Sequence, residues 1–314
     1  MVRLKNAAVI NALRQAVPKW GVAPNIFRGG DKDQASTLLG LKALDSLITH
    51  TRIPEGMFQV MINGRAEPPR SYSTPVLLED QVIFRALDPS SVYGALGRGA
   101  SLLLAGVNEF WPPLRDLCAA ISQETGLECS AFAFVSPARG KGFVPHIDRT
   151  DQLVIQCEGS KDWTVYDVLP GGARRGKRVA EQDLGHPTFE GTLSVGDMLY
   201  IPVGAPHVAF ASKQFSAHIT LIFEPVTLST SLRAAFESIM SDDSRLTSPL
   251  PPFYRDEAND WTQLIVGAAA DVAAQLPDQS ERCLALTLGG RSGSDGTQEM
   301  ARRMLRPRPN RVAT

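Results

Sequence analysis

Alternating apolar and polar residues run through the middle of this chain and limit its fold more than any other feature. Residues 152–166, 193–202 and 215–223 show this period of two. Successive side chains of a strand point to opposite faces, so the alternation indicates strands buried on one side. The glycine at Gly159 predicts a turn that divides the first stretch into a hairpin, and Gly196-Asp197 predicts a turn that leads into the strand before Pro202. We therefore expect an antiparallel, all-β core.

Three residues at the borders of these stretches could bind a metal. His146 and Asp148 are two residues apart, so in an extended segment their side chains project from the same face. His207 follows 61 residues after His146 and could supply a third ligand. Two imidazoles and one carboxylate form the facial triad that binds Fe(II) and leaves positions open for a co-substrate and dioxygen. A His-x-Asp pair is common by chance, so the surrounding residues decide how much it means.

Those surrounding residues resemble the JmjC (cupin-like) Fe(II)/2-oxoglutarate-dependent oxygenases. Three motifs carry the resemblance, and each matches the family pattern: Gly142-Phe143-Val144-Pro145-His146-Ile147-Asp148, then Gln156-Cys157-Glu158-Gly159-Ser160-Lys161-Asp162-Trp163, then Gly196-Asp197 through Tyr200, Pro202 and Gly204 to His207. The similar run extends from about residue 99 to residue 223, and it is most similar to the branch of ribosomal-protein hydroxylases.

The resemblance implies a fold and a set of cofactors. The fold is mainly β with flanking helices: a double-stranded β-helix (jelly-roll or cupin) core, a helical N-terminal segment and a C-terminal helical region. His146, Asp148 and His207 are then the catalytic metal ligands, with Fe(II) as the metal and 2-oxoglutarate and dioxygen as co-substrates. Asp148 is intact, which favours hydroxylation, because halogenating relatives lack this carboxylate.

The same resemblance assigns Lys161 to the distal carboxylate of 2-oxoglutarate. A dicarboxylate that chelates a metal at one end needs a cation at the other, and a lysine ammonium provides it. Lysine beside a turn is also a common surface residue.

Family members often place Asn and Tyr near the co-substrate where this chain has Phe132 and Phe134. Two interpretations follow. Either another residue replaces their hydrogen bonds, the candidates being Ser216, Thr220, Tyr200 and His218, or the pocket is drier and takes a different 2-oxo acid.

The resulting functional hypothesis is a dioxygenase that hydroxylates a C–H bond of a protein or peptide side chain while 2-oxoglutarate is converted to succinate. One alternative keeps the chemistry but takes a small natural product or a free amino acid as substrate. A second is a catalytically silent cupin-like binding protein, because a fold does not determine a function. A third is a zinc isomerase or hydrolase that uses no oxo acid.

Composition restricts the partners and the compartment. The formal net charge is −1, so no strong field attracts nucleic acid, and nucleic acid is not expected as a partner. The four cysteines have no metal-like spacing and are expected to be free thiols in a reducing compartment. No apolar run is long enough to cross a membrane, and the first residues lack a signal-peptide core. We expect a cytoplasmic protein.

The expected organisation has four parts. Residues 1–50 form a helical segment that packs on the core, including a helix over residues 38–48 that Ser36-Thr37 caps. Residues 51–226 are the catalytic domain, residues 227–290 a helical candidate dimerisation region, and residues 291–314 a disordered basic tail. The segment Gly171–Arg178 is rich in glycine and arginine and is expected to be a solvated insertion or a mobile lip that contacts substrate.

Overall fold

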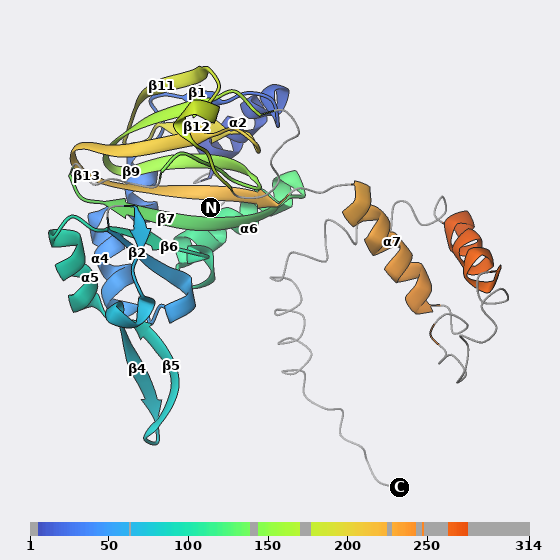
Figure 1. The fold of residues 1–314 in the computed structure, drawn as a ribbon, viewed down its shortest axis with the longest axis horizontal. Helices are drawn as coiled ribbons and strands as arrows, with labels where there is room; N and C mark the ends of the chain where they lie inside the picture. Colours follow the sequence, from blue (N-terminus) through green and yellow to red (C-terminus); the bar gives the residue numbers. More distant parts are fainter. Residues whose placement is uncertain are drawn as a thin grey trace, which may run out of the picture. The chain divides into compact units, whose positions relative to one another are not determined.

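The computed structural model describes residues 6–62, 64–138, 144–169, 177–224, 228–242, 247 and 263–275. The chain divides into two units, of which the larger contains Met1–Thr125 and Cys129–Glu224, and the smaller is made mainly of Pro225–Thr314. Figure 1 shows the larger unit as strands wrapped on one another with helices against them. Gly171 to Gly176, Cys283 and the tail 291–314 lie outside the described residues, so the predictions made for them stay predictions.

A single large sheet forms the core of the first unit. Its neighbours follow the order β1 (Asn25–Phe27), β12 (Met198–Ile201), β9 (Asp151–Tyr166), β13 (His207–Glu224), β7 (Glu128–Ser136), β6 (Ser101–Leu104), β2 (Phe58–Ile62) and β3 (Arg65–Ala66). Three more strands pair off this path: β8 (His146–Ile147), β10 (Lys177–Arg178) and β11 (Pro187–Ser194). The pairing of β9 with β11, β12 and β13 is antiparallel throughout. The predicted mainly β, jelly-roll class is confirmed.

The predicted hairpin after residue 152 is wrong, because residues 151–166 form one continuous strand. Gly159 has φ +60° and bends that strand rather than ending it. A Cβ at Gly159 would lie 1.8 Å from the Phe215 carbonyl oxygen of β13, so the close approach of the two strands requires glycine. The bend lets one strand pair with β12 in its first half and with β11 in its second half.

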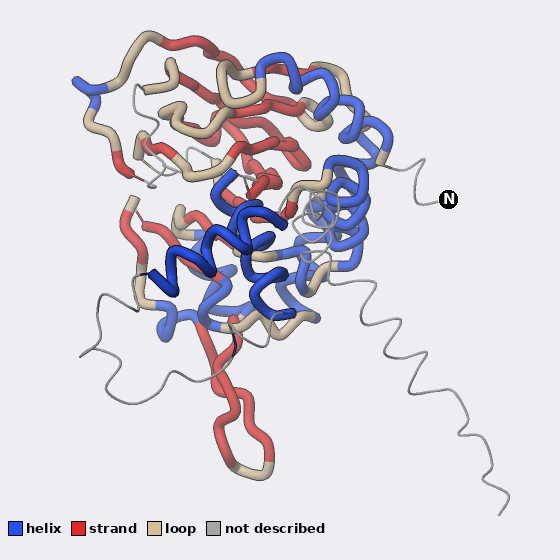
Figure 2. Tube along the Cα trace, turned by 90° about the vertical axis from the view of Figure 1, so that its right-hand side faces the viewer, coloured by secondary structure: helices blue, strands red, loops and turns tan. Residues whose placement is uncertain are grey.

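Several helices from the first 125 residues lie beside the sheet. The N-terminal helix α2 (Ala7–Ala16) stops before Pro18, as its spacing predicts. The predicted helix over residues 38–48 is instead two helices, α3 (Lys32–Leu39) and α4 (Leu41–His50), divided at Gly40. Ser36 and Thr37 lie inside α3, whose N-cap is Asp31; its carboxylate accepts the Gln34 N–H at 2.9 Å. Figure 2 shows these helices beside the strands, together with α5 (Pro89–Gly97) and α6 (Pro112–Thr125).

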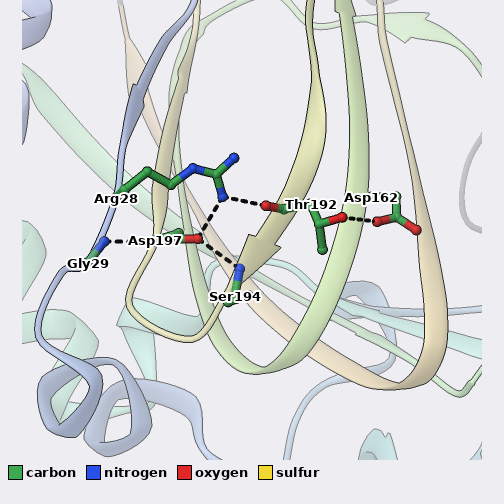
Figure 3. A network of polar contacts seen from close by, with 6 residues as sticks. All are labelled: Arg28, Gly29, Asp162, Thr192, Ser194 and Asp197. Carbon is green, nitrogen blue, oxygen red and sulfur yellow. Dashed lines mark hydrogen bonds and ion pairs between the residues drawn. The ribbon is translucent and has the colours of Figure 1, made fainter.

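A carboxylate in the Gly196-Asp197 turn joins this turn to the segment that follows β1 (Figure 3). The Asp197 side chain accepts the Ser194 N–H at 3.0 Å, the Gly29 N–H at 3.0 Å and an Arg28 N–H at 2.8 Å. Gly196 adopts φ +91°. A Cβ at Gly30 would come within 2.2 Å of the Gly196 carbonyl oxygen, so the segment after β1 lies directly on the turn. This part of the motif is therefore structural.

Replacing Asp197 with alanine is expected to lower the free energy of unfolding by about 1 kcal/mol, because two partly buried backbone N–H groups lose their acceptor. Burial raises the pKa of Asp197, but the N–H groups of Ser194 and Gly29 and the Arg28 guanidinium outweigh it and lower the pKa overall. The carboxylate therefore stabilises the fold above its unfolded pKa, and this stabilisation is lost as pH falls through the folded pKa. Urea unfolding of wild type and variant at several pH values measures this. Asp116→Ala, which removes an exposed carboxylate on α6, is the control, and equal loss in both variants would contradict the structural role.

The second unit contains two described helices, α7 (Leu228–Asp242) and the helix of residues 263–275. Each has buried apolar side chains among exposed ones: Ala235, Ile239 and Val272. Across the described parts of both units, no helix combines the length and the apolar character needed to cross a membrane.

Candidate metal centre and anion pocket

Strand pairing brings the three candidate ligands together. His146 opens β8 and His207 opens β13, and the two residues are direct partners in the antiparallel register of these strands. Asp148 follows β8 immediately. One ligand atom from each residue lies within 4.8 Å of the others. The Asp148 carboxylate is 3.3 Å from His207 Nε2 and 3.6 Å from His146 Nε2, so all three side chains point at a common centre.

Backbone carbonyls orient both imidazoles. His146 Nδ1 lies 2.9 Å from the Val144 carbonyl oxygen, and His207 Nδ1 lies 3.2 Å from that of Ala205. A carbonyl only accepts, so Nδ1 carries the proton in each ring and Nε2 presents its lone pair to the centre. Metal-binding histidines are held in this way by groups outside the coordination sphere. The donor set and its orientation therefore fit a divalent metal ion.

The charges at the centre also suit a bound metal ion. Burial, followed by the neighbouring His207, lowers the pKa of His146, so its imidazole is neutral at neutral pH. Burial raises the pKa of Asp148, but hydrogen bonding and charge from the two histidines outweigh it and hold this pKa well below its usual range. Gln152 also donates a hydrogen bond to Asp148 Oδ2. The centre thus offers an ionised carboxylate at Asp148 and a neutral imidazole at His146, which are the protonation states that a metal ligand needs.

A cavity continues inward from this centre. Besides the three candidate ligands it is lined by Phe134, Gln152, Lys161, Trp163, Ala209, His218 and Thr220. These residues come from the central strands β7, β9 and β13, whose inner faces enclose the space. Sequence reasoning assigned no role to Gln152 or Trp163, although Trp163 belongs to a quoted motif and Gln152 lies four residues after Asp148.

Lys161 is buried in this cavity without a counter-ion. Its side chain is 4% exposed, and its ammonium donates only a long bond, 3.4 Å, to Ser136 Oγ. Among the described residues no acidic side chain forms an ion pair with it. Burial lowers the pKa of Lys161 to about 7. A buried cation without a partner is costly, so this position is suited to a bound anion that supplies the missing charge.

Two more polar atoms in the cavity have no hydrogen-bond partner among the described residues: His218 Nδ1 and Trp163 Nε1. The His218 ring stacks on Phe134 with centroids 4.9 Å apart and planes at 2°, and it meets Trp163 edge-on at 5.3 Å. Burial, followed by the charge of Lys161, lowers the pKa of His218 well below its usual value, so the ring is neutral. Buried polar atoms are rarely left unpaired, and both residues line the cavity.

The other candidates lie in different places. Ser216 does not line the cavity; its hydroxyl accepts a hydrogen bond of 2.8 Å from Gln156 Nε2. The Tyr200 hydroxyl accepts the Gly21 N–H at 2.7 Å and donates to Asp151, away from the cavity. Of the polar candidates on β13, His218 and Thr220 line the cavity and Ser216 does not. The pairing of β13 with β9 shifts register between Ala217 and His218, and such a shift adds local twist.

Residues 109–230 match the family model of the JmjC domain. The bifunctional lysine-specific demethylase and histidyl-hydroxylase NO66 of Drosophila mojavensis is 36% identical over 145 residues, which are 44% of this chain and 16% of that protein. The protein of the same name from Drosophila sechellia is 35% identical over 143 residues, 44% of this chain and 22% of that protein. The chain thus matches only a small part of these relatives.

Solved structures show the same fold. YcfD, a ribosomal oxygenase from Escherichia coli, in complex with cobalt and 2-oxoglutarate, superposes with a TM-score of 0.52 over 88% of this chain and 70% of that chain, at 15% identity. The same protein in complex with cobalt and succinic acid gives a TM-score of 0.50 over 82% of this chain and 66% of that chain, at 17% identity. At these identities the likeness concerns the fold.

Proposed function

We propose, from the match of residues 109–230 to the JmjC domain model, that the protein is an Fe(II)- and 2-oxoglutarate-dependent dioxygenase that hydroxylates a protein side chain. The observation that carries the proposal is the pairing of two sites in one cavity. Three oriented candidate metal ligands line the cavity, and so does Lys161, a buried lysine without a counter-ion among the described residues. A dicarboxylate that chelates a metal with one end and binds a cation with the other requires this combination.

Each residue has a defined role in the proposal. His146, Asp148 and His207 would hold Fe(II) through two Nε2 atoms and a carboxylate oxygen. Lys161 would bind the distal carboxylate of 2-oxoglutarate. When bound, the iron, the oxo acid and dioxygen supply an oxidant that inserts oxygen into a C–H bond and yield succinate and carbon dioxide.

The chain's own residues prepare the co-substrate pocket. His218 and Trp163 line it, each with a hydrogen-bonding atom that has no partner among the described residues, and the Trp163 N–H can only donate. Phe134 forms its apolar wall and holds the His218 ring by stacking. Hydrogen bonds from His218 and Trp163 to the co-substrate would take the place of the Asn and Tyr hydrogen bonds that the sequence lacks at Phe132 and Phe134. Ser216 contacts Gln156 and does not line the pocket.

The substrate class rests on the relatives. NO66 is a bifunctional lysine-specific demethylase and histidyl-hydroxylase, and YcfD is a ribosomal oxygenase, so these names point to protein substrates. We propose a protein or peptide substrate for this chain, of cytoplasmic location, and the region 227–290 as a candidate dimerisation region. Hydroxylation of a small molecule is the alternative that the test below separates.

The test measures substrate modification and co-substrate turnover together. The purified protein is incubated with Fe(II), 2-oxoglutarate and air, and with either ribosomal proteins or methylated histone peptides. Succinate is quantified, and the proteins are mapped by mass spectrometry. We expect succinate to form in proportion to the addition of one oxygen atom to a ribosomal-protein side chain. We expect neither product with His146→Ala. Loss of methyl groups from the histone peptides instead would indicate demethylation.

Two results would overturn the proposal. Succinate formation that only free amino acids or other small molecules stimulate would favour the small-molecule alternative. Absence of 2-oxoglutarate binding under anaerobic conditions, despite tight metal binding, would favour a metal enzyme that uses no oxo acid.

A further inference from the structure

The strands β4 (Ser73–Leu78) and β5 (Gln81–Leu87) form a sheet of their own that projects from the first unit (Figures 1 and 2). Their connection is a two-residue turn in which Glu79 and Asp80 have φ +48° and +65°. We call this hairpin, residues 73–87, the arm. An isolated two-stranded sheet is marginal in water, so the outer half of the arm needs packing from elsewhere.

Both faces of the outer arm are apolar and open to solvent. Leu77 pairs with Val82, and Val76 pairs with Phe84. Opposed residues share a face and successive residues alternate, so Leu77 and Val82 lie on one face while Leu78, which pairs with Gln81 in the same register, lies on the other. Five large apolar side chains are at least 37% exposed within eight residues: Leu77, Leu78, Val82, Ile83 and Phe84. Apolar surface gathered in this way indicates a contact site rather than scattered exposure.

The edges of the arm are less suited to contact than its faces. At the base, Leu87 donates its N–H to the Ile53 carbonyl oxygen at 2.8 Å, and Ala86 bridges to Pro54. Pro75 removes a donor from β4, and the register of the pair shifts between Val76 and Leu77. Proline and bulges are the features that prevent strand addition at an edge. A partner would therefore pack on the faces of the arm.

A groove lies beside the base of the arm, with a volume of about 510 Å³. Its walls are the C-terminal end of α4, the chain that follows it and the inner half of the arm. Its apolar lining includes Ile48 and Val76, and its one permanently charged lining residue is the exposed Arg52. No acidic residue lines it. The arm has the opposite character, because its tip carries Glu79 and Asp80, and residues 73–84 include no basic side chain.

We propose that the occupant of this surface is the same arm of a second copy of the chain. Two arms related by a two-fold axis would lie antiparallel, with each tip at the base of the other. The arm is about 20 Å long, at roughly 3.3 Å per residue over six residues. Each acidic tip then meets Arg52 in the partner's groove while the apolar faces cover each other. A surface that contains both the donor and the acceptor of a contact can close on itself in this way.

Cross-linking between two differently marked proteins tests this arrangement in the full chain. Gln81→Cys marks the tip, Arg52→Cys marks the groove, and each is made with Cys283→Ser; the other three cysteines are buried. The two variants are mixed and treated with a short bis-maleimide. We expect covalent dimers joined between residues 52 and 81 in the mixture. We expect at least tenfold less from Gln81→Cys alone, because the two tips lie at opposite ends of the pair.

Removing the apolar contact gives a second measurement. Leu77→Ser with Val82→Ser, added to both marked proteins, should reduce the 52–81 cross-link at least fivefold. Val22→Ser is the matched control, since this valine is as exposed as Val82 but lies outside the arm. Three results would overturn the proposal: no 52–81 product in the mixture, equal cross-linking of Gln81→Cys alone, or no effect of the two serines. The first is also expected if the arm binds an unrelated protein.

Discussion

Asp148→Ala is expected to weaken Fe(II) binding by at least about 100-fold and to reduce succinate formation below detection. Loss of groups that merely orient a ligand already costs about 10–100-fold, and Asp148 is itself the only carboxylate of the donor set. Its removal leaves two imidazoles and no negative charge to offset the metal. The measurements are metal content after anaerobic loading and the rate of succinate formation.

Asp162→Ala is the matched control for this variant. Asp162 also belongs to the core strand β9, but its carboxylate accepts the Thr192 hydroxyl at 2.5 Å in an exposed network (Figure 3). It should keep wild-type iron content and turnover. If Asp148→Ala binds iron as the wild type does, the cluster of His146, Asp148 and His207 is not the metal centre.

Lys161→Met is expected to lower the affinity for 2-oxoglutarate by at least about 30-fold, because removing one partner of a buried charge pair costs about 2–5 kcal/mol. The wild type should also show a pH dependence. Burial lowers the pKa of Lys161 to about 7, so the amine of the free protein is neutral above that pH. A bound carboxylate stabilises the ammonium and raises the pKa, so binding takes up a proton and the affinity falls as pH rises above 7. Anaerobic calorimetry of the Fe(II)-loaded protein between pH 6 and 9 measures both effects.

Lys161→Arg separates charge from shape. An arginine stays protonated over this range, so its affinity for 2-oxoglutarate should vary little with pH even where the longer side chain fits less well. Two results would count against the assignment of Lys161. One is an affinity of Lys161→Met within threefold of the wild type. The other is a wild-type affinity that does not change between pH 7 and 9.

The candidate site was largely readable from local spacing and motif. His146 and Asp148 are two residues apart in extended chain, which places both on one face whatever the rest of the fold does. The motif positions of Lys161 and His207 supplied the remaining pair. What spacing does not contain is the register of β8 against β13, which sets His207 opposite His146. That register depends on strands that are distant in sequence.

Two predictions were wrong because contacts between distant segments decided the local structure: the turn at Gly159 and the N-cap at Ser36-Thr37. Gly159 reads as a turn because glycine permits positive φ, and a bend in a continuous strand uses the same conformation. Only the position of Phe215 on the neighbouring strand distinguishes the two. Ser36 and Thr37 are suitable N-cap residues, but Asp31 caps α3 and Gly40 begins α4. Local propensity does not decide between such competing signals.

Alternation and the two-residue spacing of His146 and Asp148 act within one strand, so they predicted a β core and two metal ligands. The family motifs added His207 and the role of Lys161. The burial of Lys161 without a counter-ion, and the unpaired nitrogen atoms of His218 and Trp163 beside the same cavity, could be seen only in the tertiary structure. The tertiary structure also decided that Ser216 and Tyr200 do not line this cavity, and that the arm stands free of the core. Burial and register arise from packing between distant segments, and no local pattern in the chain encodes them.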